Sequence, residues 1–197
     1  MSRFLGLILL LAVLITACSD PVYTPKPRAF PRIDYPTRAY TAFQNESCDF
    51  TFELPVYATV EKDTVFFDET PSHPCWFNLY FPDFDARLHC SYTPIGEKKT
   101  FDQVRSDAFE MANYHNRKAN YIDEVLIQNE LGAAGIAFEF DGPVASPYQF
   151  FLTDSLQQHF FRGALYFNTQ AKPDSLAPVV DFLKVDFDHI IASFRWQ

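Results

Sequence analysis

A ten-residue stretch near the C-terminal end, "HFFRGALYFN" at 159–168, is apolar at most of its positions. Because successive side chains of a strand point to opposite faces, this stretch would be apolar on both of them. One face would carry Phe161, Leu165 and Phe167, and the other Phe160, Ala164 and Tyr166. Such a strand is typical of a sheet that is covered on both sides. The stretch therefore predicts a central strand with a packed layer on each face.

Other segments alternate apolar and polar residues, which is the pattern of a strand with one buried face. They are "DFTFELP" (49–55), "WFNLYFP" (76–82) and "ARLHCSYTP" (86–94), and "GIAFEFDGP" (135–143) and "YQFFLTD" (148–154) are also expected to be strands. A turn at residues 82–85 separates the second segment from the third. The aromatic share of 17%, with 22 Phe, is typical of a sheet-rich body.

Two segments have helical spacing instead. In residues 100–119 apolar side chains recur every three or four positions, and Thr100 with Gln103 matches a capping box. In residues 175–195 a second apolar stripe predicts a helix with Ser175 as its N-cap, so that Pro178 would fall in the first turn. Aspartates off this stripe, Asp186 and Asp188, are expected to face water.

Strands divided by two helices predict an α+β fold class. We expect a single domain at residues 39–197, with a mainly antiparallel β-sheet. The two main helices, at about 100–119 and 175–195, would pack on this sheet.

The first 17 residues have the pattern of a signal peptide. Arg3 precedes an apolar run from Phe4 to Ile15, which is too short to span a bilayer. The following "LITAC" at 14–18 resembles a bacterial lipobox, whose cysteine is acylated and becomes the mature N-terminus. We therefore expect residues 1–17 to be removed and Cys18 to carry the lipid anchor. The alternative is a plain cleaved signal that happens to contain a cysteine.

Residues 18–38 are predicted to be a proline-rich tether. Five prolines lie between Pro21 and Pro36, and proline both fixes φ and lacks a backbone donor, so this segment should be extended. A solvated spacer is one interpretation. Partial docking is the other, because Phe30, Ile33 and Tyr35 are apolar, and a short edge strand could end at Pro36.

Acidic residues outnumber basic ones by 25 to 16, which gives a formal net charge of −9. Nucleic-acid binding needs a basic surface, so this balance argues against a nucleic-acid partner. It also argues against a polybasic attachment to lipid headgroups. Membrane attachment is therefore expected to come from the acyl chains on Cys18.

With Cys18 acylated, three cysteines remain, so the chain can form one internal disulfide. We favour Cys48–Cys75, because each lies at the start of a predicted strand and an exported chain meets oxidising conditions. A pair that includes Cys90, or no bond at all, are the alternatives.

A metal site could in principle use Cys48, His73, Cys75, His89 and Cys90. Zinc needs four convergent ligands, however, and His89 and Cys90 are neighbours in a strand and so point to opposite faces. We therefore predict no metal site and no cofactor.

No catalytic motif is present: the chain lacks G-x-S-x-G and H-E-x-x-H, and has only six glycines. Three polar residues still stand out. His115 lies on the apolar face of its helix and is interpreted as a hydrogen-bonded core histidine, with a site residue as the alternative. Asp154 and Arg162 flank a turn and are expected to pair there as a structural contact. We predict no catalytic residue.

Several stretches together resemble the gliding-motility lipoprotein GldD family of Bacteroidota. They are Pro25–Arg28, "FELPVYA" (52–58), "CWFNLYFP" (75–82), "FFLTDS" (150–155), "RGALYFN" (162–168) and "DSLAPVVDFL" (174–183). The last three are specific in combination, and the likeness covers nearly the whole mature chain. Cys90 departs from the pattern, since an apolar strand residue is expected there, and is interpreted as a core thiol.

The resemblance implies an envelope-anchored part of the gliding machinery, which is tied to type IX secretion. It implies other envelope proteins and lipoproteins of that machinery as partners, and no established catalytic residues. We therefore predict a non-enzymatic component or assembly factor, lipid-anchored in the outer or inner membrane and facing the periplasm. The alternative is a periplasmic enzyme or small-ligand-binding lipoprotein whose site forms only in the fold.

Overall fold

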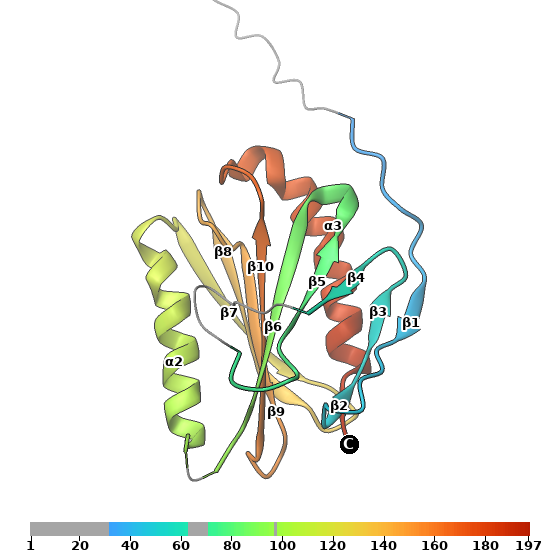
Figure 1. Cartoon of the computed structure of the whole chain (residues 1–197). Coiled ribbons are helices and arrows are strands. Elements are labelled where there is room, and N and C mark those ends of the chain that lie inside the picture. Colours follow the sequence, from blue (N-terminus) through green and yellow to red (C-terminus); the bar gives the residue numbers. More distant parts are fainter. Residues whose placement is uncertain (1–31, 63–70, 97) are drawn as a thin grey trace, which may run out of the picture. The chain divides into compact units, whose positions relative to one another are not determined.

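The computed structural model describes residues 32–62, 71–96 and 98–197. The predicted signal peptide at 1–17, the predicted anchor Cys18 and the tether up to residue 31 lie outside the described residues. Residues 34–197 form one compact unit, and the fold below is that of this unit (Figure 1).

The core of the unit is one seven-stranded antiparallel sheet, ordered β4-β5-β6-β10-β9-β8-β7. Its strands are β4 (Thr59–Glu61), β5 (Phe77–Phe81), β6 (Ala86–Pro94), β7 (Tyr121–Gln128), β8 (Ala134–Asp141), β9 (Tyr148–Thr153) and β10 (His159–Phe167). The strand β10, which was predicted to be central, is the fourth of the seven. The predicted α+β class with a mainly antiparallel sheet is therefore confirmed.

Two short ribbons accompany the main sheet. One pairs β1 (Tyr40–Ala42) with β3 (Glu53–Pro55), and the other pairs β2 (Phe50–Thr51) with β11 (Arg195–Trp196). The segment 49–55, predicted as one strand, is thus divided between two ribbons.

The edge strand considered at Ile33–Pro36 does not form, since the first described strand begins at Tyr40. Tyr35 instead packs its ring on Phe182, with ring centroids 4.5 Å apart. Its hydroxyl also donates to the carbonyl oxygen of Pro178 at 3.2 Å. Side-chain contacts with a helix, and not a ladder of backbone hydrogen bonds, hold this end of the predicted tether.

Helix α2 (Phe101–Tyr114) continues into the 3₁₀ turn η2 (His115–Arg117). Its predicted capping box is confirmed: the Gln103 amide donates to the Thr100 hydroxyl, and the Thr100 amide donates to the Gln103 side chain. A second 3₁₀ turn, η1 (Pro82–Phe84), forms the predicted turn between β5 and β6.

Helix α3 (Pro173–Ser193) begins three residues earlier than the predicted N-cap implies. Lys172, not Ser175, is its N-cap, and Pro173 occupies the first helical position, where its fixed φ is already helical. Ser175 and Leu176 both donate their amides to the carbonyl of Lys172. Pro178 therefore lies inside the helix and not in the first turn.

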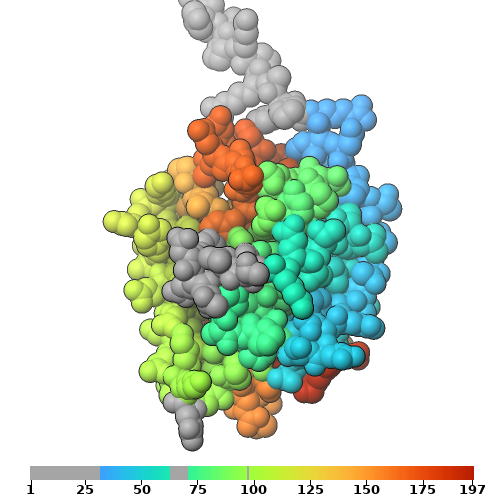
Figure 2. Space-filling view, in the orientation of Figure 1, coloured from blue at the N-terminus to red at the C-terminus, as the bar shows by residue number. Residues whose placement is uncertain are grey.

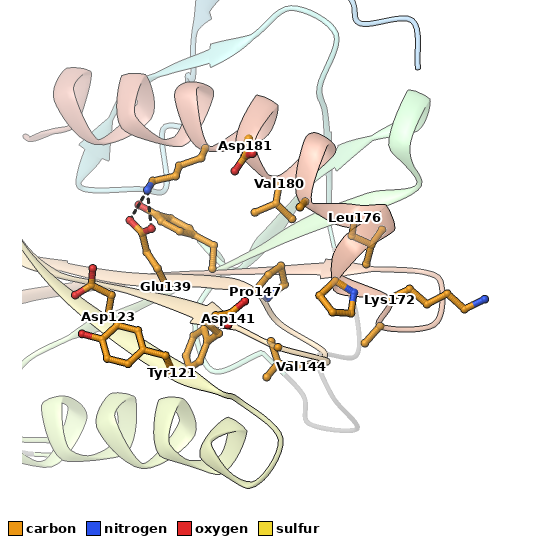
Figure 3. A pocket seen from close by; sticks show the side chains of 17 residues that line it. Tyr121, Asp123, Glu139, Asp141, Val144, Pro147, Lys172, Leu176, Val180 and Asp181 are labelled. Atoms are coloured by element: carbon orange, nitrogen blue, oxygen red, sulfur yellow. Dashed lines mark hydrogen bonds and ion pairs between the residues drawn. The ribbon is translucent and has the colours of Figure 1, made fainter. Parts of the chain in front are cut away.

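The two helices lie on opposite faces of the sheet (Figure 3). Under α2 is an apolar cluster that includes Phe138, Phe151 and Phe160. On the α3 face, Phe187 packs against Tyr148 and Phe194 packs against Phe161. Both faces of the central strand are thus covered, which explains its doubly apolar sequence.

In the space-filling view, α2 (yellow-green) forms one side of the visible surface, and residues of β1 to β4 (blue to teal) form the other (Figure 2). The described helices include none that is both long and apolar enough to cross a bilayer.

Candidate functional site

The most buried charge of the unit is the carboxylate of Asp186 on α3, whose side chain is 0% exposed. It accepts hydrogen bonds from Arg38 Nε at 3.2 Å, from the Tyr40 hydroxyl at 2.8 Å and from the Tyr57 hydroxyl. The prediction that Asp186 faces water was therefore wrong. The helical stripe could not reveal it, because the segment that covers this side of α3 comes from residues 38–57, far away in sequence.

The cluster around Asp186 is a structural clamp. Burial and the hydrogen bond to Asp186 raise the pKa of Tyr40 to about 12. The same causes raise the pKa of Tyr57 further. Both phenols thus stay protonated at neutral pH and act as donors to the carboxylate, so this cluster ties β1 and the turn between β3 and β4 to α3.

A second buried cluster surrounds Tyr92 on β6. Its hydroxyl lies 3.0 Å from Asp49 Oδ2 and 2.6 Å from His159 Nδ1, and His159 stacks on Trp196. Burial and the nearby Asp49 raise the pKa of Tyr92. This phenol is therefore a hydrogen-bond donor and not a nucleophile, and it joins the chain before β2 to both β10 and the C-terminal ribbon.

The predicted pair between Asp154 and Arg162 does not form. Asp154 Oδ1 accepts from the amides of Gln158 and His159 at 2.7 and 2.9 Å, and Oδ2 accepts from the amide of Leu156. The carboxylate is therefore used to close the turn between β9 and β10. Arg162 lies three residues further into β10 than His159, opposite Phe151 of β9.

Arg162 and His115 meet under α2, which the sequence did not predict. Arg162 is 9% exposed and donates from Nη2 to Gln149 Oε1 at 2.6 Å. His115 is also 9% exposed, and its ring packs edge-on against Phe140 with centroids 5.2 Å apart. Burial and the charge of Arg162 lower the pKa of His115. Within the described residues its ring makes no hydrogen bond, so it differs from the hydrogen-bonded core histidine that was expected.

Cys48 and Cys75 are joined by a disulfide, with their Cα atoms 5.5 Å apart. Cys90 is free and buried on the α3 face of β6, and burial raises the pKa of its thiol. The described residues contain no group of three His, Cys, Asp or Glu side chains placed to hold a metal ion.

A cavity of about 350 Å³ lies between α3 and the ends of β7 and β8 (Figure 3). Its acidic lining includes Asp123, Glu139 and Asp141. Glu139 is already paired, since Lys184 Nζ lies 2.6 Å from its Oε2 (Figure 3). Burial raises the pKa of Asp188 on the same helix, and the charge of Glu139 adds to that rise. Of the two lysines in the lining, Lys172 and Lys184, Lys184 is thus paired within it, and Asp123 and Asp141 are exposed carboxylates.

The fold and these clusters define a class of protein: a single α+β domain whose buried polar groups mostly join distant segments. Residues 20–196 match the family model described as gliding motility lipoprotein GldD. The chain belongs to this family, so the predicted recognition is confirmed. The family is one of envelope lipoproteins that take part in gliding motility and is not a known enzyme class.

Among solved structures, the chain is similar to the solution structure of cyanobacterial PsbP (CyanoP) from Synechocystis sp. PCC 6803. It has 12% sequence identity and a TM-score of 0.49, and the match covers 88% of this chain and 100% of the other. The comparison with curated proteins finds no match.

Proposed function

We propose that this protein is a non-enzymatic component or assembly factor of the gliding machinery, acting within the part of that machinery linked to type IX secretion. Its partners would be other envelope proteins and lipoproteins of the machinery. One observation carries the proposal: the clusters around Asp186, Tyr92 and Asp154 use their polar groups in contacts that hold the fold. Because these polar groups are used in structural contacts, they support the view that the protein acts by binding and not by catalysis.

The proposed attachment is through acyl chains on Cys18, after removal of residues 1–17. Two or more chains give stable membrane anchoring without a spanning helix. Tyr35 and Arg38 contact α3, so the C-terminal end of the predicted tether is docked on the domain. This docking supports a free tether that is shorter than residues 18–38. We propose that the domain, held in this way, faces the periplasm.

The test is complementation of a deletion strain with the wild-type gene and with Cys18→Ser, scored for gliding and for secretion. The variant should leave the washed membrane fraction or accumulate as the uncleaved precursor, and function should fall with it. Cys90→Ala is the matched control, because it removes a buried thiol outside the predicted anchor. Palmitate labelling that persists in Cys18→Ser would contradict the anchor, and gliding unaffected by the deletion would contradict the function.

A second cavity, of about 700 Å³, lies beside Arg162 between α2 and the strands β6 and β10. It favours a second candidate function, that of a small-ligand-binding lipoprotein. The two functions are compatible, because ligand binding to a machine component needs no catalysis.

A further inference from the structure

A cavity of about 700 Å³ lies between α2 and the strands β6 and β10. This volume falls within the roughly 300–1,000 Å³ that is typical of small-molecule sites. Apolar and aromatic side chains, including Trp76, Met111, Tyr114 and Phe160, make up half of its lining, and polar or charged side chains, including Glu110, make up the other half. Arg162 and His115 also line it. An apolar cavity with a few convergent polar groups is the usual form of a ligand pocket.

Arg162 is a buried cation whose charge is not neutralised within the described residues. A guanidinium has five N–H donors, but Arg162 makes one hydrogen bond, to the neutral side chain of Gln149. None of the described carboxylates lies within ion-pair distance of it. Asp107, which also lines the cavity, is paired with Lys99 at 3.2 Å. Burying such a charge without a counter-ion is costly, so an anion that enters the cavity would recover part of that cost.

The surroundings of Arg162 select the kind of anion. Burial and the Arg162 charge lower the pKa of His115, so at neutral pH the imidazole is uncharged and can only donate or accept a hydrogen bond. One guanidinium then faces the ligand, and it matches one carboxylate in a bidentate pair. A phosphate dianion would keep a surplus negative charge among apolar side chains. The aromatic lining would bury a hydrocarbon or aromatic tail.

We propose that this cavity binds a small apolar monocarboxylate, with Arg162 recognising the carboxylate and Trp76, Met111 and Phe160 contacting the tail. His115 lies beside the guanidinium and would contribute one hydrogen bond. Gln149 acts through Arg162: its side-chain oxygen holds the guanidinium, while its Nε2 has no hydrogen-bond partner among the described residues. This proposal rests on the second candidate function above, the binding of a small ligand, and does not depend on the proposed role in the gliding machinery.

The test measures binding of 4-phenylbutanoate at pH 7 to the acylated mature protein in lipid nanodiscs, by isothermal titration calorimetry, with empty nanodiscs as the blank. The matched neutral probe is 4-phenylbutanamide, which has the same tail. We expect the acid to bind at least tenfold more tightly than the amide, because only the acid pairs with Arg162. Equal affinity for the two probes, or no binding of the acid, would overturn the proposal.

Variants then assign the site. Arg162→Gln should lose the preference for the acid, and Arg162→Lys should recover part of it as a point charge without the guanidinium fork. Arg105→Gln is the matched control, because it removes an exposed arginine of α2 that pairs with Asp102. An acid preference that survives in folded Arg162→Gln would overturn the assignment. If that variant does not fold, the comparison of acid and amide on the wild-type protein still decides the proposal.

Discussion

At the scale of single residues, buried charge determines which side chains hold the fold. Asp186 is buried among Arg38, Tyr40 and Tyr57, and each of the three donates a hydrogen bond to it. A buried carboxylate is tolerated when it is paired and hydrogen-bonded, and its removal leaves its former partners buried and unpaired. Asp186 thus stabilises the fold because all three of these hydrogen-bond partners are in place.

Asp186→Ala should lower the free energy of unfolding by about 3 kcal/mol, since removing one partner of a buried pair costs about 3–5 kcal/mol and Arg38 keeps some access to solvent. Chemical denaturation monitored by tryptophan fluorescence measures this change. Asp181→Ala, on the exposed side of the same helix, is the control and should change stability by no more than about 0.5 kcal/mol. Equal effects of the two substitutions would show that the clamp does not contribute to stability.

His115 predicts a pH dependence of stability. Its pKa in the folded protein is lowered from 6.5 by burial and by Arg162. Between the lowered value and 6.5, the unfolded chain binds a proton that the folded chain does not, so the free energy of unfolding decreases as the pH falls through this window. His115→Gln should remove this contribution.

The measurement is a series of urea denaturations of both proteins from pH 7.5 to pH 5. The other four histidines are present in both proteins, so the difference between the two curves reports on His115. A difference that stays constant with pH would contradict the lowered pKa.

At the scale of elements, the strand predicted best is the one whose neighbours constrain it on both sides. The doubly apolar β10 was placed at the centre from its sequence, and β5, β6, β8 and β9 followed from alternation or from apolar runs. The strand β7 was missed. It is one of the two edge strands of the sheet, Leu126 in it is 84% exposed, and Asp123 and Glu124 interrupt the apolar pattern. The sequence of an edge strand need not follow a regular apolar pattern, because one side of the strand faces water and not another strand.

The candidate site was less predictable than the fold, and the reason is register. Asp154 and Arg162 are close in sequence, but pairing of β9 with β10 places Arg162 opposite Phe151 and within reach of Gln149. The meeting of Arg162 with His115 depends on how α2 packs over the sheet. Local periodicity contains no information on such contacts, and the same limit explains why Asp186 was expected to face water.

Helix α3 gives a prediction at this scale. Phe187 is 0% exposed and packs against Phe81 and Tyr148, so Phe187→Asp would bury an unpaired charge in the core. We expect a loss of more than about 4 kcal/mol, which would leave little of the folded form. Val185→Asp is the control, because Val185 lies on the same helix and is 49% exposed. Circular dichroism melts that coincide for the two variants would contradict this packing.

At the scale of the whole molecule, the unit formed by residues 34–197 is held together by contacts between segments far apart in sequence. The Asp186 clamp, the Tyr92 cluster and the Cys48–Cys75 disulfide each join segments from different parts of the chain. These contacts hold together an acidic domain, which the proposed lipid anchor would keep at the membrane. The account therefore has one central claim, namely that the protein acts by contact and not by catalysis.

Complementation of a deletion strain with three polar variants tests this claim most directly. They are His115→Gln, Asp154→Asn and Asp83→Asn, the last in the exposed turn η1. Gliding is scored per molecule of folded protein, alongside co-purification of partners from the membrane. Losing a catalytic group costs many orders of magnitude in rate, whereas an interface distributes its energy over a few anchors. We expect each variant that accumulates to retain gliding. A variant that is folded, still binds its partners and 4-phenylbutanoate, and yet abolishes gliding would contradict the claim and indicate an active site at that residue.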